Sequence, residues 1–299
     1  MKRALKWLAW TIAGLVVLLA ALAFAAQILS DRKMHRRIDI AVQPVAYVSE
    51  PQALERGRYL FASRGCAECH GSEGRGKVML DTPDGLFVRT PDLTPAGPTG
   101  KYSERDWVRA VRHGVKPSGQ PMLIMPTEDF NRLTDEDLAA IVAYTRSLAP
   151  GEGRAAEMRL PLPVRALYAA GFVQDGAEKV DHTLPPSRPV PAAITLEHGA
   201  YVAYTCAGCH GEHLSGGKIP GGPPDWPAAA NLTPGDGSAM RRYDTPEKFV
   251  AMMRSGQRPD GSAVSPVMPF AMLKEMNDTD LQALYLHLKQ LPPRPAGQR

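Results

Sequence analysis

The sequence CAECH at residues 66–70 recurs as CAGCH at residues 206–210, and these two stretches contain every cysteine of the chain. Each has the pattern C-x-x-C-H, which is the attachment signal of a c-type haem. Two cysteines separated by two residues can add their thiols to the two vinyl groups of one haem. The histidine that follows is then held beneath the iron and can coordinate it. The sequence therefore predicts two covalently bound haem c groups and a function in one-electron chemistry.

Two other kinds of site use a C-x-x-C pair. A thioredoxin-type redox pair lies near a βαβ pattern, and the sequence shows no such pattern. A zinc site with four cysteines would not require a histidine directly after each pair. Two copies of the motif with no spare cysteine favour haem attachment. The predicted haem-binding residues are Cys66, Cys69, His70, Cys206, Cys209 and His210.

An uncharged segment from Trp7 to Ser30 is rich in Leu, Ala and Val. A helix that spans a bilayer needs about 20 apolar residues, whereas the apolar region of a secretory signal usually has about 7–15. The length favours a retained anchor over residues 1–30, although Ala23-Phe24-Ala25 offers a cleavage site for a signal sequence. Basic residues flank the segment on both sides and do not decide its orientation. Because c-type haem is attached outside the bacterial cytoplasm, we expect a single-pass protein of the bacterial inner membrane with its bulk in the periplasm.

The net charge of +4 comes from the residues that flank this segment. Residues 1–37 contain seven Lys and Arg and one Asp, which leaves 28 basic and 30 acidic residues in the rest of the chain. The basic excess is therefore placed where it can meet lipid phosphates. We expect the inner membrane as a partner, and no nucleic acid.

The second half of the chain repeats the first at an offset of about 140 residues. LERGRY at 54–59 matches LEHGAY at 196–201, and DLTP at 92–95 matches NLTP at 231–234. A repeat this long indicates a duplicated domain, because solenoid units have about 20–50 residues. The predicted organisation is an anchor or signal at 1–30, a tether at 31–50, domains at 51–150 and 194–293, a Pro-rich linker at 151–193 and a frayed tail at 294–299.

Both domains are predicted to be all-α, and no stretch alternates as a β-strand does. Helices are expected over 51–64, 103–113, 245–255 and 278–291, and another begins after Leu133. Ser103 and Thr134 are expected to cap their helices, since a hydroxyl accepts the unpaired backbone N–H groups of the first turn. Residues 164–172 are expected to form a short helix packed between the domains.

Met125 and Met268 are the predicted sixth ligands of the two irons. They lie 55 and 58 residues after His70 and His210, occupy one aligned position and each precede a proline that stiffens the loop. A methionine ligand raises the haem potential, and the alternative is a methionine that fills a gap in the core. The predicted iron ligands are thus His70, Met125, His210 and Met268. We expect the second ring N–H of each histidine to bind a backbone carbonyl.

Two further aligned pairs have more than one conceivable use. Arg112 and Arg254 could pair with a haem propionate through a charge-assisted hydrogen bond, or lie on a solvated helix face. Gly57 and Gly199 are expected to let two helices approach closely instead of contacting haem.

From residue 54 to 148 and again from 196 to 291, the chain resembles class I cytochrome c domains. An N-terminal helix with Gly and Tyr, the C-x-x-C-H run, the distal methionine and a C-terminal helix carry this resemblance. The finer pattern is L-T-P, an aromatic-plus-Val helix that ends in R-x-G, then M-P and D-L. It is similar to the haem domains of the cytochrome subunit of bacterial membrane alcohol dehydrogenases. Those subunits have three haem domains and this chain has two, so it is closer to the membrane-anchored dihaem cytochromes c.

The resemblance implies an electron carrier and not an enzyme. We expect it to relay single electrons from a dehydrogenase or quinol-oxidising donor to a terminal oxidase or another acceptor. A dihaem redox enzyme of the peroxidase kind is one alternative, which would need an open iron position and acid–base residues above it. The other is the electron-transfer subunit of a membrane dehydrogenase complex. The sequence names neither the donor nor the acceptor.

Overall fold

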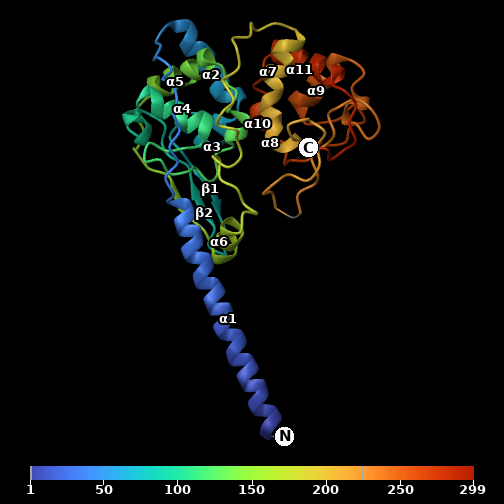
Figure 1. The fold of residues 1–299 in the computed structure, drawn as a ribbon. Helices are drawn as coiled ribbons and strands as arrows, with labels where there is room; N and C mark the ends of the chain where they lie inside the picture. The colour runs from blue at the N-terminus through green and yellow to red at the C-terminus, as the bar shows by residue number, and fades with distance from the viewer. Residues whose placement is uncertain (1, 224) are drawn as a thin grey trace.

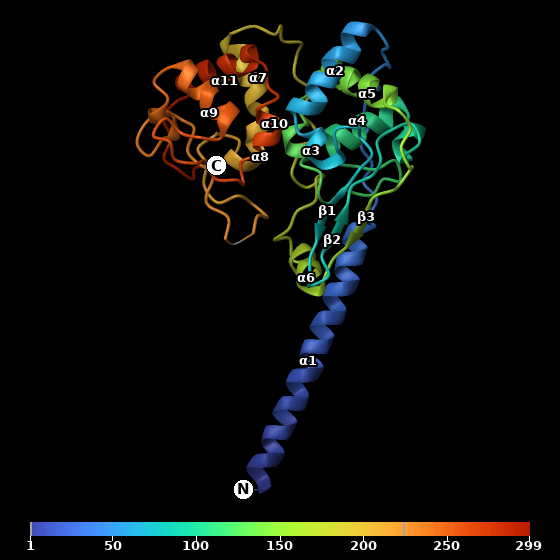
Figure 2. The same cartoon turned by 180° about the vertical axis from the view of Figure 1, so that it is seen from behind.

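A long N-terminal helix leads into two helical units that lie side by side (Figures 1 and 2). The computed structural model describes residues 2–223 and 225–299. Helix α1 (Lys2–Met34) has a mean hydropathy of 2.6 over its most apolar window, none of which is buried in the protein. By length and composition α1 can therefore cross a membrane. The helix continues through the first four residues of the predicted tether.

The first unit is built on two packed helices, α2 (Pro51–Ser63) and α5 (Asp135–Ser147). Gly57 lies where these helices cross, because a Cβ at this position would collide with the carbonyl of Ala140. Leu60, Trp107 and Leu138 belong to the buried core of this unit. Its helices are α2 (Pro51–Ser63), α3 (Cys66–His70), α4 (Glu104–His113) and α5 (Asp135–Ser147), with the 3₁₀ turns η1 (Pro98–Lys101) and η2 (Thr127–Asp129).

The second unit repeats this arrangement. Gly199 lies at the equivalent crossing, where a Cβ would collide with the carbonyl of Ala283. The expectation that both glycines permit close helix approach is confirmed. The elements of this unit are α7 (Leu196–Ala203), η3 (Tyr204–Cys206), α8 (Ala207–His210), η4 (Ala239–Arg242), α9 (Pro246–Ser255), α10 (Phe270–Leu273) and α11 (Asp278–Gln290).

Local capping chemistry places the helix starts close to where the sequence predicts them. Ser103 and Asp106 form a capping box at the start of α4. The hydroxyl of Thr134 accepts the backbone N–H of Asp137 at 3.0 Å at the start of α5. Each bond satisfies a donor that the helix itself cannot pair, and this fixes the boundary.

The chain is mostly helical, which confirms the predicted fold class, but it also contains a small sheet that the sequence analysis did not find. Strands β1 (Val78–Asp81), β2 (Phe87–Arg89) and β3 (Glu157–Arg159) form a small antiparallel sheet in the order β1-β2-β3. Strands of three or four residues are too short to show a clear alternation of apolar and polar side chains. The third strand is supplied by the segment predicted as a linker.

The helix expected between the domains lies elsewhere. Helix α6 (Leu162–Ala169) packs along α1 instead (Figure 2). Arg165 pairs with Asp31 at 2.6 Å, and the Lys33 ammonium donates to the carbonyl of Tyr168 at 3.0 Å. These bonds to α1 hold α6 against it.

The tail is ordered by the second C-x-x-C-H run, so its prediction as a frayed segment was wrong. The Arg299 guanidinium donates to the carbonyls of Cys209 at 2.7 Å and Gly208 at 3.1 Å. The backbone N–H of Gly297 donates to the carbonyl of Ser215 at 3.0 Å. Donors in the tail thus pair with carbonyls of the run and of the loop that follows it.

Candidate haem sites

Both C-x-x-C-H runs form a single tight helical turn, which we call an attachment turn. The first is α3, and the second is α8 together with Cys206 at the end of η3. Gly71 and Gly211 follow the turns with φ of 79° and 83°, in the left-handed region that favours glycine. Burial raises the pKa of the Cys66 and Cys206 thiols to about 12, so both are protonated at neutral pH.

In each attachment turn, one ring nitrogen of the histidine is hydrogen-bonded to a backbone carbonyl. Nδ1 of His70 lies 3.1 Å from the carbonyl of Pro91, and Nδ1 of His210 lies 2.8 Å from the carbonyl of Ala230. A carbonyl can only accept, so Nδ1 carries the proton and Nε2 has its lone pair free for a metal. Burial lowers the pKa of both histidines, which keeps the rings neutral.

The aligned L-T-P motifs aim these carbonyls, a role that the sequence analysis missed. Asp92 accepts the N–H of Thr94 at 2.8 Å, and Asn231 accepts the N–H of Thr233 at 2.9 Å. Both bonds form a turn just after the carbonyl that faces the histidine. The repeated Asp/Asn-Leu-Thr-Pro pattern is the signal from which this turn could have been found.

Asp92 and Asn231 also tie down the chain that follows each C-terminal helix. Asp92 accepts the N–H of Gly153 at 2.8 Å, whereas the Asn231 amide donates to the carbonyl of Arg294 at 2.8 Å. The acid faces a donor and the amide faces an acceptor. The difference between the repeats therefore follows from the group that each residue meets.

Met125 and Met268 occupy equivalent places in the two units. Met125 is half-buried against the core of the first unit and Met268 against that of the second. The carbonyl of Met125 accepts the N–H of Thr127 at 2.9 Å, and that of Met268 accepts the N–H of Phe270 at 2.9 Å. The two methionines thus start the same turn, which leads into η2 and α10.

Arg112 and Arg254 both bind groups within their own units, although Arg112 is buried and Arg254 is exposed. Arg112 is buried, donates to the carbonyl of Leu133 at 2.6 Å and pairs with Asp135 at 2.7 Å. Arg254 binds the carbonyl of Lys274 and pairs with Asp278 at 2.9 Å. Each guanidinium fastens one helix to the start of the C-terminal helix in its own unit.

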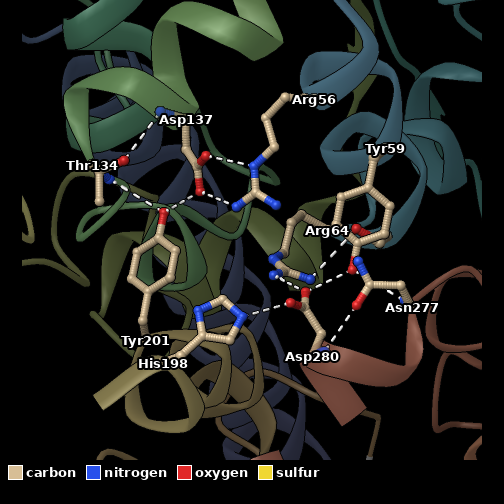
Figure 3. Close-up of polar contacts among 10 residues, drawn as sticks. Arg56, Tyr59, Arg64, Thr134, Asp137, His198, Tyr201, Asn277 and Asp280 are labelled. Carbon is tan, nitrogen blue, oxygen red and sulfur yellow. Dashed lines mark hydrogen bonds and ion pairs between the residues drawn. The ribbon is translucent and has the colours of Figure 1, made fainter. Parts of the chain in front are cut away.

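Two equivalent hydrogen-bond sets join the units to each other (Figure 3). The Tyr59 hydroxyl donates to Asp280 at 2.6 Å, and the Tyr201 hydroxyl donates to Asp137 at 2.7 Å. The Tyr59 oxygen also accepts the N–H of Asn277 at 3.1 Å. Each unit therefore reaches the N-terminus of the other unit's last helix, in an approximately two-fold arrangement that the repeat explains.

Two arginines of the first unit neutralise the two acids. Arg56 pairs with Asp137 at 2.8 Å, and Arg64 pairs across the interface with Asp280 at 2.6 Å. His198 lies 2.7 Å from the same carboxylate. Burial raises the pKa of Asp280, but its hydrogen bond with His198 and the charge of Arg64 outweigh burial and hold that pKa well below its usual range. The carboxylate is thus ionised inside the interface.

The attachment turns themselves lie at this interface. The backbone N–H of Gly208 in the second turn donates to Asp129 of the first unit at 2.9 Å. Gly65, just before the first turn, approaches α10 so closely that a Cβ would lie 2.9 Å from the sulfur of Met272. Each attachment turn therefore touches the segment that follows the aligned methionine of the other unit. Groups attached at these turns would be neighbours, which suits electron transfer between them.

A family model described as cytochrome c matches residues 54–149 and 197–292. The chain belongs to the cytochrome c family. The resemblance of each unit to a cytochrome c domain is confirmed, and covalently bound haem c is the cofactor that such domains imply.

Several curated proteins are similar over most of this chain. The gluconate 2-dehydrogenase cytochrome c subunit of Pantoea cypripedii is 27% identical over 82% of the chain and 61% of that protein. The alcohol dehydrogenase (quinone) cytochrome c subunit of Gluconobacter oxydans is 27% identical over 82% of the chain and 56% of that protein. A nicotinate dehydrogenase subunit of Pseudomonas putida is 30% identical over 81% of the chain and 22% of that protein.

The chain spans about a fifth to three-fifths of the length of these relatives. Two of them are named as cytochrome c subunits of dehydrogenases. The expectation of an electron carrier that is not itself the catalytic chain agrees with those names.

Proposed function

We propose that the chain binds two haem c groups and carries electrons as the cytochrome subunit of a membrane dehydrogenase complex. The observation that carries the proposal is the contact of both attachment turns with the opposite unit across one closed interface. The names of the relatives support the kind of complex. When bound, haem supplies one-electron chemistry at iron.

The residues at each turn fit a covalently bound haem. In the first unit, Cys66 and Cys69 would form the two thioethers, and His70 would bind iron through Nε2, as in the turn of the second unit with Cys206, Cys209 and His210. The indole N–H of Trp107 is buried without an acceptor among the described residues, and a haem carboxylate would satisfy it.

The protein's own groups would hold the iron in a closed state. The carbonyls of Pro91 and Ala230 orient the two histidines. Met125 and Met268 would also hold the iron through their sulfur atoms and so exclude water and small ligands from it. An iron held by two protein side chains would change its charge by one electron with little rearrangement, which favours transfer over catalysis.

The direction of transfer follows from the partners. We propose that a dehydrogenase donates electrons in the periplasm and that a terminal oxidase or another acceptor receives them. Helix α1 would keep the cytochrome in the bacterial inner membrane, beside both partners.

Optical spectroscopy of the purified protein tests the proposal. Pyridine haemochrome analysis should give two haem c groups per chain, and the oxidised protein should show the near-infrared band of methionine–iron ligation. Carbon monoxide should leave the spectrum of the reduced protein unchanged. A carbon monoxide complex at one haem would mean an open iron, and would favour the peroxidase-like enzyme instead.

A further inference from the structure

Helix α6 turns an apolar face outward. Its sequence from 160 to 173, LPLPVRALYAAGFV, contains a single charged residue, Arg165. Phe172 just after the helix is 76% exposed, and Leu162 and Leu167 are 42% and 47% exposed. The exposed residues of this segment are all uncharged: Leu162, Pro163, Ala166, Leu167, Ala170, Gly171 and Phe172. Single exposed leucines are common on soluble proteins, but a whole helix face of this kind is not.

The charged and hydrogen-bonding groups of α6 face the protein. Arg165 pairs with Asp31 of α1 at 2.6 Å, so its charge is neutralised on the inner side. Tyr168 is fully buried, and its hydroxyl donates to Asp175 at 2.7 Å. The outer face of α6 is thus left without a polar group of its own side chains.

The position of α6 along α1 identifies its surroundings. Near this point α1 has Ala23, Ala26, Ile28 and Ser30 partly or fully shielded, and α6 packs against α1. Of these residues, Ala23, Ala26 and Ser30 follow one another at helical spacing. These residues belong to the uncharged segment that begins at Trp7. Figures 1 and 2 both show α6 beside α1 below the two units. A medium that covers the end of that segment must also meet α6.

Lengths place this region at the edge of a bilayer. At about 1.5 Å per residue, the segment from Trp7 to Ser30 is roughly 36 Å long, whereas the hydrocarbon core is about 30 Å thick and the headgroup layers bring the total to about 40–45 Å. The excess of about 6 Å is about one helical turn, so the last turn of the segment, and the part of α6 beside it, would lie among the headgroups. Amphipathic helices bind this layer by burying their apolar face about 5–10 Å deep.

We propose that α6 is a second membrane contact, with its outer face inserted in the phospholipid headgroup layer. The inference rests on the proposed anchoring by α1. In the small sheet, whose strand β3 ends shortly before α6, Val78 and Met158 are also exposed, at 51% and 38%. Arg36, two residues after the end of α1, pairs with Asp175 at 2.7 Å and fixes the chain there to the segment after α6. The two contacts together hold the haem units at one orientation to the bilayer.

Photocrosslinking to lipid tests this proposal on the full-length, haem-loaded protein. Benzoylphenylalanine is introduced separately at Leu167, at Leu18 in the span and at Leu196, and each protein is placed in vesicles of phosphatidylethanolamine and phosphatidylglycerol. Leu196 is the matched control, since it is a leucine 44% exposed at the start of α7 in the second unit. We expect lipid adducts at Leu18 and at Leu167, several-fold above those at Leu196.

The outcomes separate the two proposals. Adducts at Leu18 without adducts at Leu167 would overturn the second contact and leave the anchor intact. No adduct at Leu18 would overturn the anchoring and the contact together. An adduct of Leu167 with a protein purified in the same complex, in place of lipid, would make this face a protein docking site and also overturn the inference.

Discussion

His70 and His210, the proposed iron ligands, show how one hydrogen bond orients a histidine ring. Each ring faces a backbone carbonyl through Nδ1. The bond fixes both the tautomer and the direction of Nε2 before any iron is bound. The carbonyl is aimed by a turn that Asp92 makes in one unit and Asn231 in the other. Ligand geometry at the residue scale thus depends on residues some 20 positions further along the chain.

Replacing the aligned methionines tests them as iron ligands. Met125→Ala and Met268→Ala should each abolish the near-infrared methionine band of one haem. The potential of that haem should fall by on the order of 100 mV, a part of the roughly 0.8 V range that axial ligands span. Redox titration followed optically measures both effects.

Met122→Ala is the control, because Met122 lies nearby but has no aligned partner in the second unit. Both bands and both potentials should persist in that variant. Loss of a band in Met122→Ala, with Met125→Ala unaffected, would reassign the ligand.

Asp92→Asn should destabilise the first unit, because the amide can present its NH₂ group where a carboxylate oxygen now accepts the N–H of Gly153. The expected cost is about 1–3 kcal/mol, the range for a buried group left unpaired. Thermal unfolding of the haem-loaded protein measures the loss. Asn231→Asp should cost a similar amount, because a carboxylate would face the carbonyl of Arg294. Equal stability of both variants and the native chain would contradict the assigned partners.

At the scale of elements, the sequence predicts those structures that are fixed by bonds between residues close together in the chain. The helix starts at Ser103 and Thr134 follow from side chains that bond within three residues. The attachment turns follow from the fixed spacing of cysteine and histidine. Strand β3 and the packing partner of α6 could not be found in this way, since contacts distant in the sequence decide them: β2 holds β3, and α1 holds α6. The tail is likewise ordered only by its contact with the second attachment turn.

The interface between the units could not be predicted from the sequence either, because its contacts join residues that are distant in the chain. Tyr59 and Asp280 are 221 positions apart. Tyr59 aligns with Tyr201 and Asp280 aligns with Asp137, and packing inside each unit would be enough to explain both aligned pairs. Only the folded chain shows that each tyrosine binds the acid of the other unit. The repeat is nevertheless why two such bonds exist.

Removing both tyrosine hydroxyls should loosen the pairing of the units. Tyr59→Phe with Tyr201→Phe deletes the two crossing bonds to carboxylates without changing the charge. Hydrogen bonds to charged groups contribute about 1.5–3 kcal/mol each. We expect a lower unfolding temperature and slower electron transfer between the haems after flash reduction, with unchanged haem spectra.

Tyr285→Phe supplies the matched control, because the hydroxyl of Tyr285 donates to the carbonyl of Tyr243 inside the second unit at 3.2 Å. This variant should leave the transfer rate between the haems as it is. An equal slowing in the control would show that the rate does not depend on the crossing bonds.

In the whole molecule, ionised groups sit between the two attachment turns. The side chains of Arg64 and Asp280 are 3% and 0% exposed, and Arg64 lies two residues before Cys66. A buried ion pair of this kind is costly to form and more costly to break, because the remaining charge has no partner. The contact between the units, and with it the spacing of the two haem sites, therefore depends on Asp280 keeping its charge.

Because the pairing of the units depends on this charge, the pairing should weaken at low pH. The pKa of Asp280 is lower in the folded protein than in the unfolded chain, so its contribution is complete above the unfolded value, about 4. Stability should fall as the pH drops from about 4 toward the lower, folded value, since the unfolded chain then binds the proton first. Unfolding midpoints in denaturant, measured from about pH 7 to pH 3, record the decline.

Asp280→Asn should lose about 3–5 kcal/mol at neutral pH, as expected when one partner of a buried pair is removed, and its decline below about pH 4 should be shallower than that of the native chain. Asp236→Asn, which changes an exposed acid paired with Arg241 at 3.0 Å, should keep the native acid profile. A native profile in Asp280→Asn would place the acid sensitivity in other carboxylates and remove Asp280 as its source.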